Sequence, residues 1–226
     1  MKKYPEISIA AVFQNNAQRL AGKAYAAYYM DGKFNDISWT EMNEMVHNLA
    51  YYLLSRGIQK GDKVGIFSPN RYEWHLAALA IHSIGAVDVP IYGTNSAQEA
   101  EYILENSDSK LCMAGTKDHL DKVLQVRDRL PLITGIIAFD EPVVKIDEVV
   151  SLKDALEAGK GKADEATFDQ RLNAIQPNDL ATLIYTSGTT GNPKGVMLTH
   201  NNFYSNVDNT LYEMRDRKTG KPLLTE

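Results

Sequence analysis

One stretch of the sequence combines glycines, hydroxyl side chains and a lysine in a pattern that suits the binding of a phosphate chain. It runs from Thr186 to Gly195. Three of its residues are glycines, which let backbone N–H groups turn toward an anion: Gly188, Gly191 and Gly195. Four offer hydroxyl donors: Thr186, Ser187, Thr189 and Thr190. Lys194 adds a cation for phosphate oxygens, so the stretch is predicted to bind a triphosphate.

The residues on either side predict that this loop joins two strands. Leu180–Tyr185 has the composition of a buried strand, and the apolar run Val196–Thr199 follows the loop directly. The common P-loop is excluded, because it needs Gly-Lys-Ser/Thr before a helix, whereas Pro193 precedes Lys194 and Gly195 follows it. A flexible surface hairpin is the alternative on composition alone, since Gly, Ser, Thr and Asn are ordinary loop residues.

The order of residues from Tyr185 to Val196 resembles the signature loop of the acyl-adenylate-forming (AMP-binding) enzymes. These include acyl-CoA synthetases, the adenylation domains of peptide synthetases and firefly luciferase. Two earlier stretches, Ser38–Glu41 and Gly61–Ile66, resemble the start of the same family. Later stretches are similar to its long-chain fatty acyl-CoA synthetase (ligase) branch: Asn70–Trp74, Gly85–Tyr92 and Glu101–Ser107. Gly93 departs from the branch, which often has proline there, but it lies far along the chain from the signature loop.

The resemblance implies a reaction in two steps. With Mg²⁺ present, a carboxylate attacks the α-phosphate of ATP to give acyl-AMP and pyrophosphate, and the thiol of coenzyme A then displaces AMP. By the same resemblance, residues Thr186 to Lys194 wrap the β- and γ-phosphates. Thr186 supplies a hydroxyl to the Mg²⁺ site, and Lys194 is the catalytic residue that neutralises charge on the pyrophosphate. We therefore expect a long-chain fatty acid–CoA ligase acting on fatty acid, ATP and coenzyme A.

Two alternatives stay open on the sequence. Family members also adenylate other carboxylic acids or amino acids, and the acyl pocket is expected downstream of Glu226. The second alternative is a non-catalytic phosphate-binding module. The family's adenine and ribose loops, its acidic Mg²⁺ partner and its C-terminal catalytic lysine have no match here, so we expect an N-terminal fragment that is inactive alone.

Upstream of the loop, short apolar strands alternate with helices, which predicts an α/β fold with a parallel sheet covered by helices on both faces. The expected strands are Lys63–Ser68, Ala86–Tyr92, Lys110–Ala114 and Gly135–Phe139. The expected helices are Met42–Leu54, Arg71–Ile84, Ala97–Asn106 and Lys117–Leu130. A hairpin is predicted around Asp31-Gly32, between Ala24–Met30 and Lys33–Trp39.

The remaining segments complete the predicted organisation. Glu157–Ala166 is polar and predicted to be a loop, although Ser151 is a possible start of a helix just before it. Asn201–Met214 is predicted to be helical. We divide the chain into an N-terminal α/β subdomain, residues 1–176, and a phosphate-loop hairpin with its following segment, residues 177–226, which begins the next subdomain.

Other reactive residue types are predicted to be structural. Cys112 lies in an apolar strand and is expected to be inert core. His75 and His82 share a helix face but have no Cys or carboxylate at the spacing of a zinc site, so packing or solvent exposure is expected. His200 follows the second strand of the hairpin and is expected to be a structural polar residue, with proximity to the active site as the alternative.

Composition limits the class of protein and its location. A formal net charge of −5 argues against a nucleic-acid partner. The basic start Met1–Lys3 has no apolar run behind it, and no stretch reaches the roughly 20 apolar residues that a bilayer demands. The single cysteine fits a reducing compartment. We expect a cytoplasmic protein, with peripheral contact to the inner face of the membrane as an open alternative, and the sequence does not predict its oligomeric state.

Overall fold

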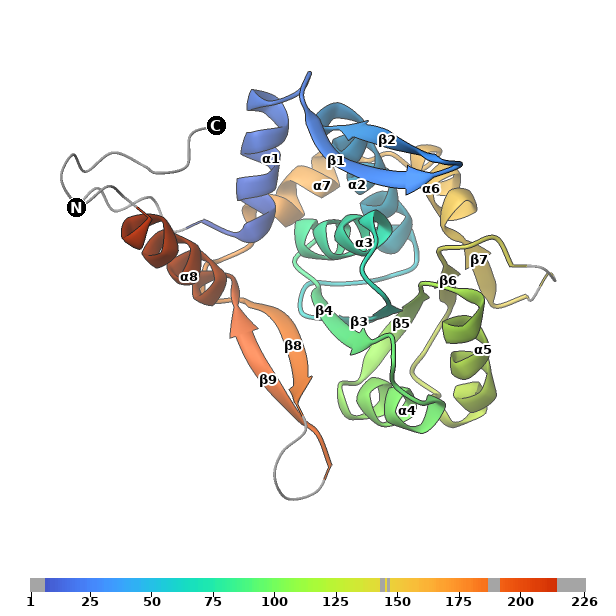
Figure 1. The fold of residues 1–226 in the computed structure, drawn as a ribbon. Coiled ribbons are helices and arrows are strands. Elements are labelled where there is room, and N and C mark those ends of the chain that lie inside the picture. The colour runs from blue at the N-terminus through green and yellow to red at the C-terminus, as the bar shows by residue number, and fades with distance from the viewer. Residues whose placement is uncertain (1–6, 143–144, 146, 187–191, 215–226) are drawn as a thin grey trace.

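A mixed β-sheet forms the centre of the molecule. The computed structural model describes residues 7–142, 145, 147–186 and 192–214, and within them one sheet has seven strands in the order β7-β6-β5-β3-β4-β8-β9 (Figure 1). Its strands are β3 Lys63–Ser68, β4 Val87–Tyr92, β5 Ser109–Ala114, β6 Ile136–Ala138, β7 Val149–Ser151, β8 Leu180–Thr186 and β9 Lys194–Thr199. All neighbouring strands pair in parallel except β8 and β9. The predicted parallel α/β sheet is confirmed.

Helices cover both faces of this sheet, as the strand–helix alternation predicts. One face packs against α2 Trp39–Ser55, α3 Tyr72–Ser83, α6 Leu152–Lys160 and α7 Glu165–Asn173. The other packs against α4 Ala97–Asn106 and α5 Lys117–Val126, which continues into a 3-10 turn at Arg127–Arg129. In β3, Val64 and Ile66 belong to the first core and Phe67 to the second. Because successive side chains of a strand point to opposite faces, one short strand serves both cores.

A small hairpin and a helix pack on the outside of α2 and α3 (Figure 1). The hairpin pairs β1 Ala24–Met30 with β2 Lys33–Ser38, and α1 Ile9–Arg19 precedes it. Asp31 and Gly32 have φ values of 53° and 79°, the positive angles that a tight two-residue turn requires, so the predicted turn is confirmed. Ser38 then caps α2 through a reciprocal bond with Glu41.

The predicted loop at Glu157–Ala166 is wrong at both ends, and only its residues 161–164 lie outside helices. Helix α6 extends to Lys160, and α7 begins at Glu165 after an Asp164 cap. The sequence of this region is polar because each helix buries only a narrow strip of residues: Leu152, Ala155 and Gly159 in α6, and Phe168 in α7. Helix α1, which Ser8 caps, and the three-residue strand β7 were also not predicted.

The hairpin β8–β9 extends the main sheet and is followed by α8 His200–Glu213, which agrees with the predicted helix. Strand β8 meets β4 at a single pair of residues, Asp88 and Thr182, and β9 pairs with β8 alone. Figure 1 shows the hairpin diverging from β4 and passing beside α4. The division at residue 176 stays a prediction. In the part of the chain that the structure describes, no helix has the length and apolar character needed to span a bilayer.

Candidate functional site

The predicted phosphate loop has two arms. The incoming arm is the end of β8, Tyr185 and Thr186, and the outgoing arm is Pro193 with the first residue of β9, Lys194. Thr186 and Lys194 are opposite each other in the antiparallel ladder, and both are exposed. Lys194 forms no ion pair with any described residue, so its charge is available to a ligand. The structure thus brings together Thr186 and Lys194. The other predicted phosphate-binding residues lie outside the described part of the chain: Ser187, Gly188, Thr189, Thr190 and Gly191.

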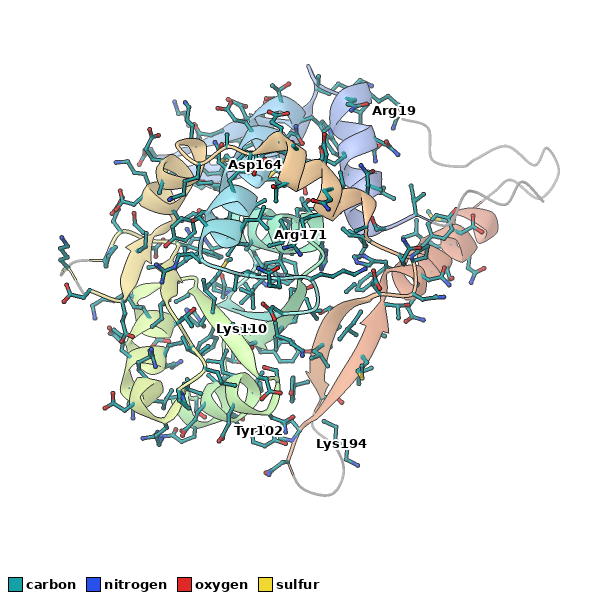
Figure 2. All side chains as sticks on the ribbon, turned by 180° about the vertical axis from the view of Figure 1, so that it is seen from behind. Arg19, Tyr102, Lys110, Asp164, Arg171 and Lys194 are labelled. Atoms are coloured by element: carbon teal, nitrogen blue, oxygen red, sulfur yellow. The ribbon has the colours of Figure 1, made fainter. Side chains whose placement is uncertain are left out.

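Helix α4 holds both arms through side chains that sequence analysis missed. The Tyr102 hydroxyl donates to the carbonyl of Pro193 at 3.0 Å, and the Tyr185 hydroxyl donates to Oδ1 of Asn106 at 2.8 Å. Figure 2 shows Tyr102 and Lys194 near each other at the end of the hairpin. The sequence signal for these contacts was the spacing of Tyr102 and Asn106, which are four residues apart and therefore share one face of the helix.

Gly195 allows the Tyr185 ring to cross the hairpin. The two residues are opposite each other, and a Cβ on Gly195 would lie 3.2 Å from Cζ of Tyr185 and 3.2 Å from Cδ2 of Leu183. The Tyr185 and Tyr102 rings meet edge to face with their centroids 6.3 Å apart. Burial raises the pKa of the Tyr185 hydroxyl, so it is a neutral donor at physiological pH.

A buried polar cluster attaches the hairpin to the sheet at the one pair that joins β4 to β8. Asp88 accepts from Nε2 of His82 at 2.6 Å and from the Thr182 hydroxyl at 3.0 Å. His82 also approaches the carbonyl of Ala181 at 3.1 Å. Buried hydrogen bonds to a charged group are strong, so the cluster fixes β8 against β4 where the ladder alone is short. The structural interpretation of His82 is confirmed.

His200 lies against this cluster at the start of α8. Its ring centroid is 5.5 Å from that of His82, and its Nδ1 accepts from the backbone N–H of Ile9 at 3.3 Å. Burial, with the neighbouring His82, lowers the pKa of His200 to about 4. His200 is therefore neutral at physiological pH and structural, as expected.

Loops at the carboxyl ends of β3, β5 and β6 are joined by Arg71. Its guanidinium binds both carboxylate oxygens of Glu73 at 2.7 Å, contacts Asp140 at 2.9 Å and donates to the carbonyl of Gly115. The hydrogen bond to Glu73 is the main reason that the pKa of Arg71 is raised. Because its charge is compensated inside the protein, Arg71 is a cross-link between loops and a poor candidate for anchoring a phosphate.

The remaining reactive side chains are structural. Cys112 is buried, and burial raises its pKa to about 12, which keeps the thiol protonated and confirms its expected place in the core. His75 is exposed and lies 3.4 Å from the Tyr25 hydroxyl. Within the described residues, no group of three His, Cys, Asp or Glu side chains could hold a metal ion.

Comparisons with known proteins support the family that the signature loop resembles. The chain is 37% identical over 180 residues to the long-chain-fatty-acid–CoA ligase FadD15 of Mycobacterium bovis, covering 79% of this chain and 29% of the relative. It is 33% identical over 199 residues to the long-chain-fatty-acid–CoA ligase ACSBG2 of Xenopus laevis, covering 88% and 27%. The chain therefore spans less than a third of the length of these curated relatives.

Solved structures share the fold. The crystal structure of a long-chain-fatty-acid–CoA ligase from Archaeoglobus fulgidus superposes with a TM-score of 0.74 at 25% identity, covering 92% of this chain and 40% of that one. An anthranilate–CoA ligase in complex with anthranoyl-AMP superposes with a TM-score of 0.72 at 22% identity, covering 87% and 36%, and this likeness shows the fold alone. The sequence model of the AMP-binding enzyme family matches residues 13–222, nearly the whole chain. The chain belongs to the AMP-binding enzyme family.

Proposed function

We propose that this chain is the phosphate-binding part of an ATP-dependent ligase that converts a long-chain fatty acid to acyl-AMP and then to acyl-CoA. The observation that carries the proposal is the family match over residues 13–222, which includes the signature loop. Relatives from a bacterium and a vertebrate both carry the name of long-chain-fatty-acid–CoA ligases, in agreement with the branch resemblance of the sequence. Because the chain spans less than a third of these relatives, the activity belongs to the protein as a whole.

The proposed roles of the described arms follow from their chemistry. Lys194 supplies one positive charge from the start of β9, and charge-assisted contacts to phosphate oxygens are among the stronger hydrogen bonds in proteins. In this role it stabilises charge that develops on pyrophosphate as the carboxylate oxygen bonds to the α-phosphorus and the bond from that phosphorus to pyrophosphate breaks. The hydroxyls and glycines of residues 186–191 are proposed to donate to the β- and γ-phosphates.

The described residues fit Mg²⁺ held largely by the nucleotide. Thr186 offers one exposed hydroxyl oxygen, a hard donor of the kind that Mg²⁺ accepts. Mg²⁺ usually binds substrate phosphates, water and few protein ligands, so a single hydroxyl oxygen fits that pattern. When bound, Mg²⁺ would neutralise phosphate charge, and the Thr186 hydroxyl would orient it.

Exchange of labelled pyrophosphate into ATP tests this proposal in the full protein. A long-chain fatty acid should stimulate exchange more strongly than acetate, and addition of coenzyme A should yield acyl-CoA and AMP. Anthranilate and a mixture of amino acids are the matched controls, since they represent the aryl-acid and amino-acid adenylating branches. Stronger stimulation by either control would overturn fatty acid as the proposed substrate class. Absence of exchange with every acid would overturn the proposed ligase activity.

A further inference from the structure

We propose that Tyr102 is a positioning residue for the phosphate loop, acting from α4 through the carbonyl of Pro193 on the placement of Lys194. The inference rests on the proposed function for its kinetic consequence and on the geometry of the described residues for its structural one. Tyr102 itself lies on a helix and contacts the loop's outgoing arm, where its hydroxyl donates to Pro193 at 3.0 Å.

The proline explains why this arm needs a contact from outside the hairpin. Proline has no backbone N–H and cannot donate a ladder hydrogen bond, so the chain at residue 193 cannot be fixed by donation to β8. The described ladder begins one residue later, with Lys194 opposite Thr186. The Tyr102 bond therefore restrains the peptide that leads directly into Lys194.

The incoming arm has a matching contact one helical turn along α4. Asn106 accepts from the hydroxyl of Tyr185, which lies next to Thr186, at 2.8 Å. The Tyr185 ring also covers Gly195 on the opposite strand, where a Cβ would be only 3.2 Å from Cζ of that ring. Tyr102 and Asn106 thus hydrogen bond to the two arms of the loop from a single face of α4.

Helix α4 is itself fixed well enough to act as a reference. Ser96 and Glu99 form a complete capping box at its first turn. Leu104 packs into the core, where Cδ2 occupies the space that a Cβ on Gly65 would need. Glu101 forms an ion pair with Arg129 just beyond α5. Movement of the arms relative to α4 is therefore movement relative to the sheet.

The consequence for phosphate binding follows from the geometry of Lys194. Displacements of about 1 Å in a positioned group can reduce rates by up to about 100-fold, because the gain from orientation is lost. Removing one uncharged hydrogen bond should loosen the arm without unfolding the domain, since such a bond contributes roughly 0.5–1.5 kcal/mol, or about 2- to 10-fold in local opening.

The first test is structural and needs no activity. Tyr102→Phe keeps the ring and removes only the hydroxyl, so amide hydrogen exchange over residues 194–199 should become about 2- to 10-fold faster in the full protein. Exchange in β3 and β4 should not change. Tyr185→Phe should likewise speed exchange over residues 183–186. Tyr25→Phe is the matched control, because it removes a hydroxyl whose contact is to His75, distant from the hairpin.

The second test distinguishes positioning from general stability. Tyr102→Phe should lower kcat/KM for MgATP in pyrophosphate exchange by about 3- to 10-fold, chiefly through kcat, and leave the KM for fatty acid unchanged. In a Lys194→Ala background the same substitution should have almost no further effect, because its target is gone. Independent, additive effects would overturn the positioning role.

The two proposals fail in different ways. If wild-type protein shows no acid-dependent exchange, the ligase proposal fails, while hydrogen exchange still decides the role of Tyr102. If wild-type protein is active but Tyr102→Phe leaves both the amide exchange of residues 194–199 and the kcat/KM for MgATP unchanged, the positioning role is overturned and the ligase proposal stands.

Discussion

Lys194 is the described residue whose charge the proposed chemistry depends on most directly. It is exposed at the start of β9, so Lys194→Ala should leave folding nearly unchanged. The substitution removes a charge-assisted contact of about 1.5–3 kcal/mol, which corresponds to a loss of roughly 10- to 100-fold in adenylation. Steady-state pyrophosphate exchange in the full protein measures the loss. Lys33→Ala, an exposed lysine of the β1–β2 hairpin, is the control and should retain wild-type rates.

The lowered pKa of His200 predicts that the free energy of unfolding depends on pH. Its pKa is lowered to about 4 in the fold, against 6.5 for an ordinary histidine, so the unfolded chain takes up a proton before the folded one does. Stability from this residue is complete above pH 6.5 and is lost as the pH falls from 6.5 toward 4. Urea unfolding at pH 7.5 and pH 5 should show a loss on the order of 2 kcal/mol from this source.

The contribution of His200 is isolated by comparing variants at the two pH values. His200→Gln retains a side-chain acceptor but cannot be protonated, so its stability should fall less between pH 7.5 and pH 5 than that of wild type. His75→Gln, at an exposed position, should keep the wild-type dependence. An equal fall in wild type and His200→Gln would assign the acid sensitivity to other groups.

At the scale of elements, α6 packs tightly against α2 at Gly159. A Cβ on Gly159 would lie 1.8 Å from the carbonyl oxygen of Asn48 and 2.8 Å from its carbonyl carbon, so backbone would have to move. Gly159→Ala should therefore lower the free energy of unfolding by about 1–3 kcal/mol, even though alanine favours a helix. The urea midpoint measures this loss.

Gly161 supplies a matched control at the end of the same helix. Its φ is −70°, and the nearest atom to a Cβ there is 3.7 Å away, an ordinary contact. Gly161→Ala should leave stability unchanged or slightly higher. Equal losses in the two variants would show that α6 does not pack on α2 through Gly159.

For the whole molecule, we predict that residues 1–226 fold alone but catalyse no adenylation and bind MgATP only weakly. The two cores on either side of the sheet are complete enough to fold without a partner. A phosphate loop contacts one end of the nucleotide, and its contacts must offset lost translational freedom. A dissociation constant of about 1 mM or weaker follows, equivalent to about −4 kcal/mol.

Calorimetric titration of MgATP into the purified chain measures this affinity, and circular dichroism provides the control for folding. Micromolar affinity, or acyl-AMP formed from a fatty acid by this chain alone, would show that residues 1–226 hold more of the active site than the arms of the loop. An unfolded chain would contradict the first half of the prediction.

Much of the fold and the family could be predicted from the sequence because both are recorded in short stretches of the chain, whereas the roles of the site residues stay predictions. The strand at Lys63–Ser68 and the capped helix at Ala97–Asn106 have the predicted bounds, since apolar runs and capping pairs act over a few residues. The signature from Tyr185 to Val196 resembles that of the AMP-binding enzymes, and the family match over residues 13–222 confirms this assignment.

Tertiary structure alone decided which distant residues support that loop. Helix α7 forms because Phe168 is buried near His47 and Tyr51 of α2. The polar sequence of α7 does not predict this contact. Tyr102 lies 91 residues from Pro193, and Asp88 lies 94 residues from Thr182, yet each pair is hydrogen bonded. Sequence patterns record what a residue needs from its neighbours in the chain, whereas such contacts arise only when strands and helices are packed together.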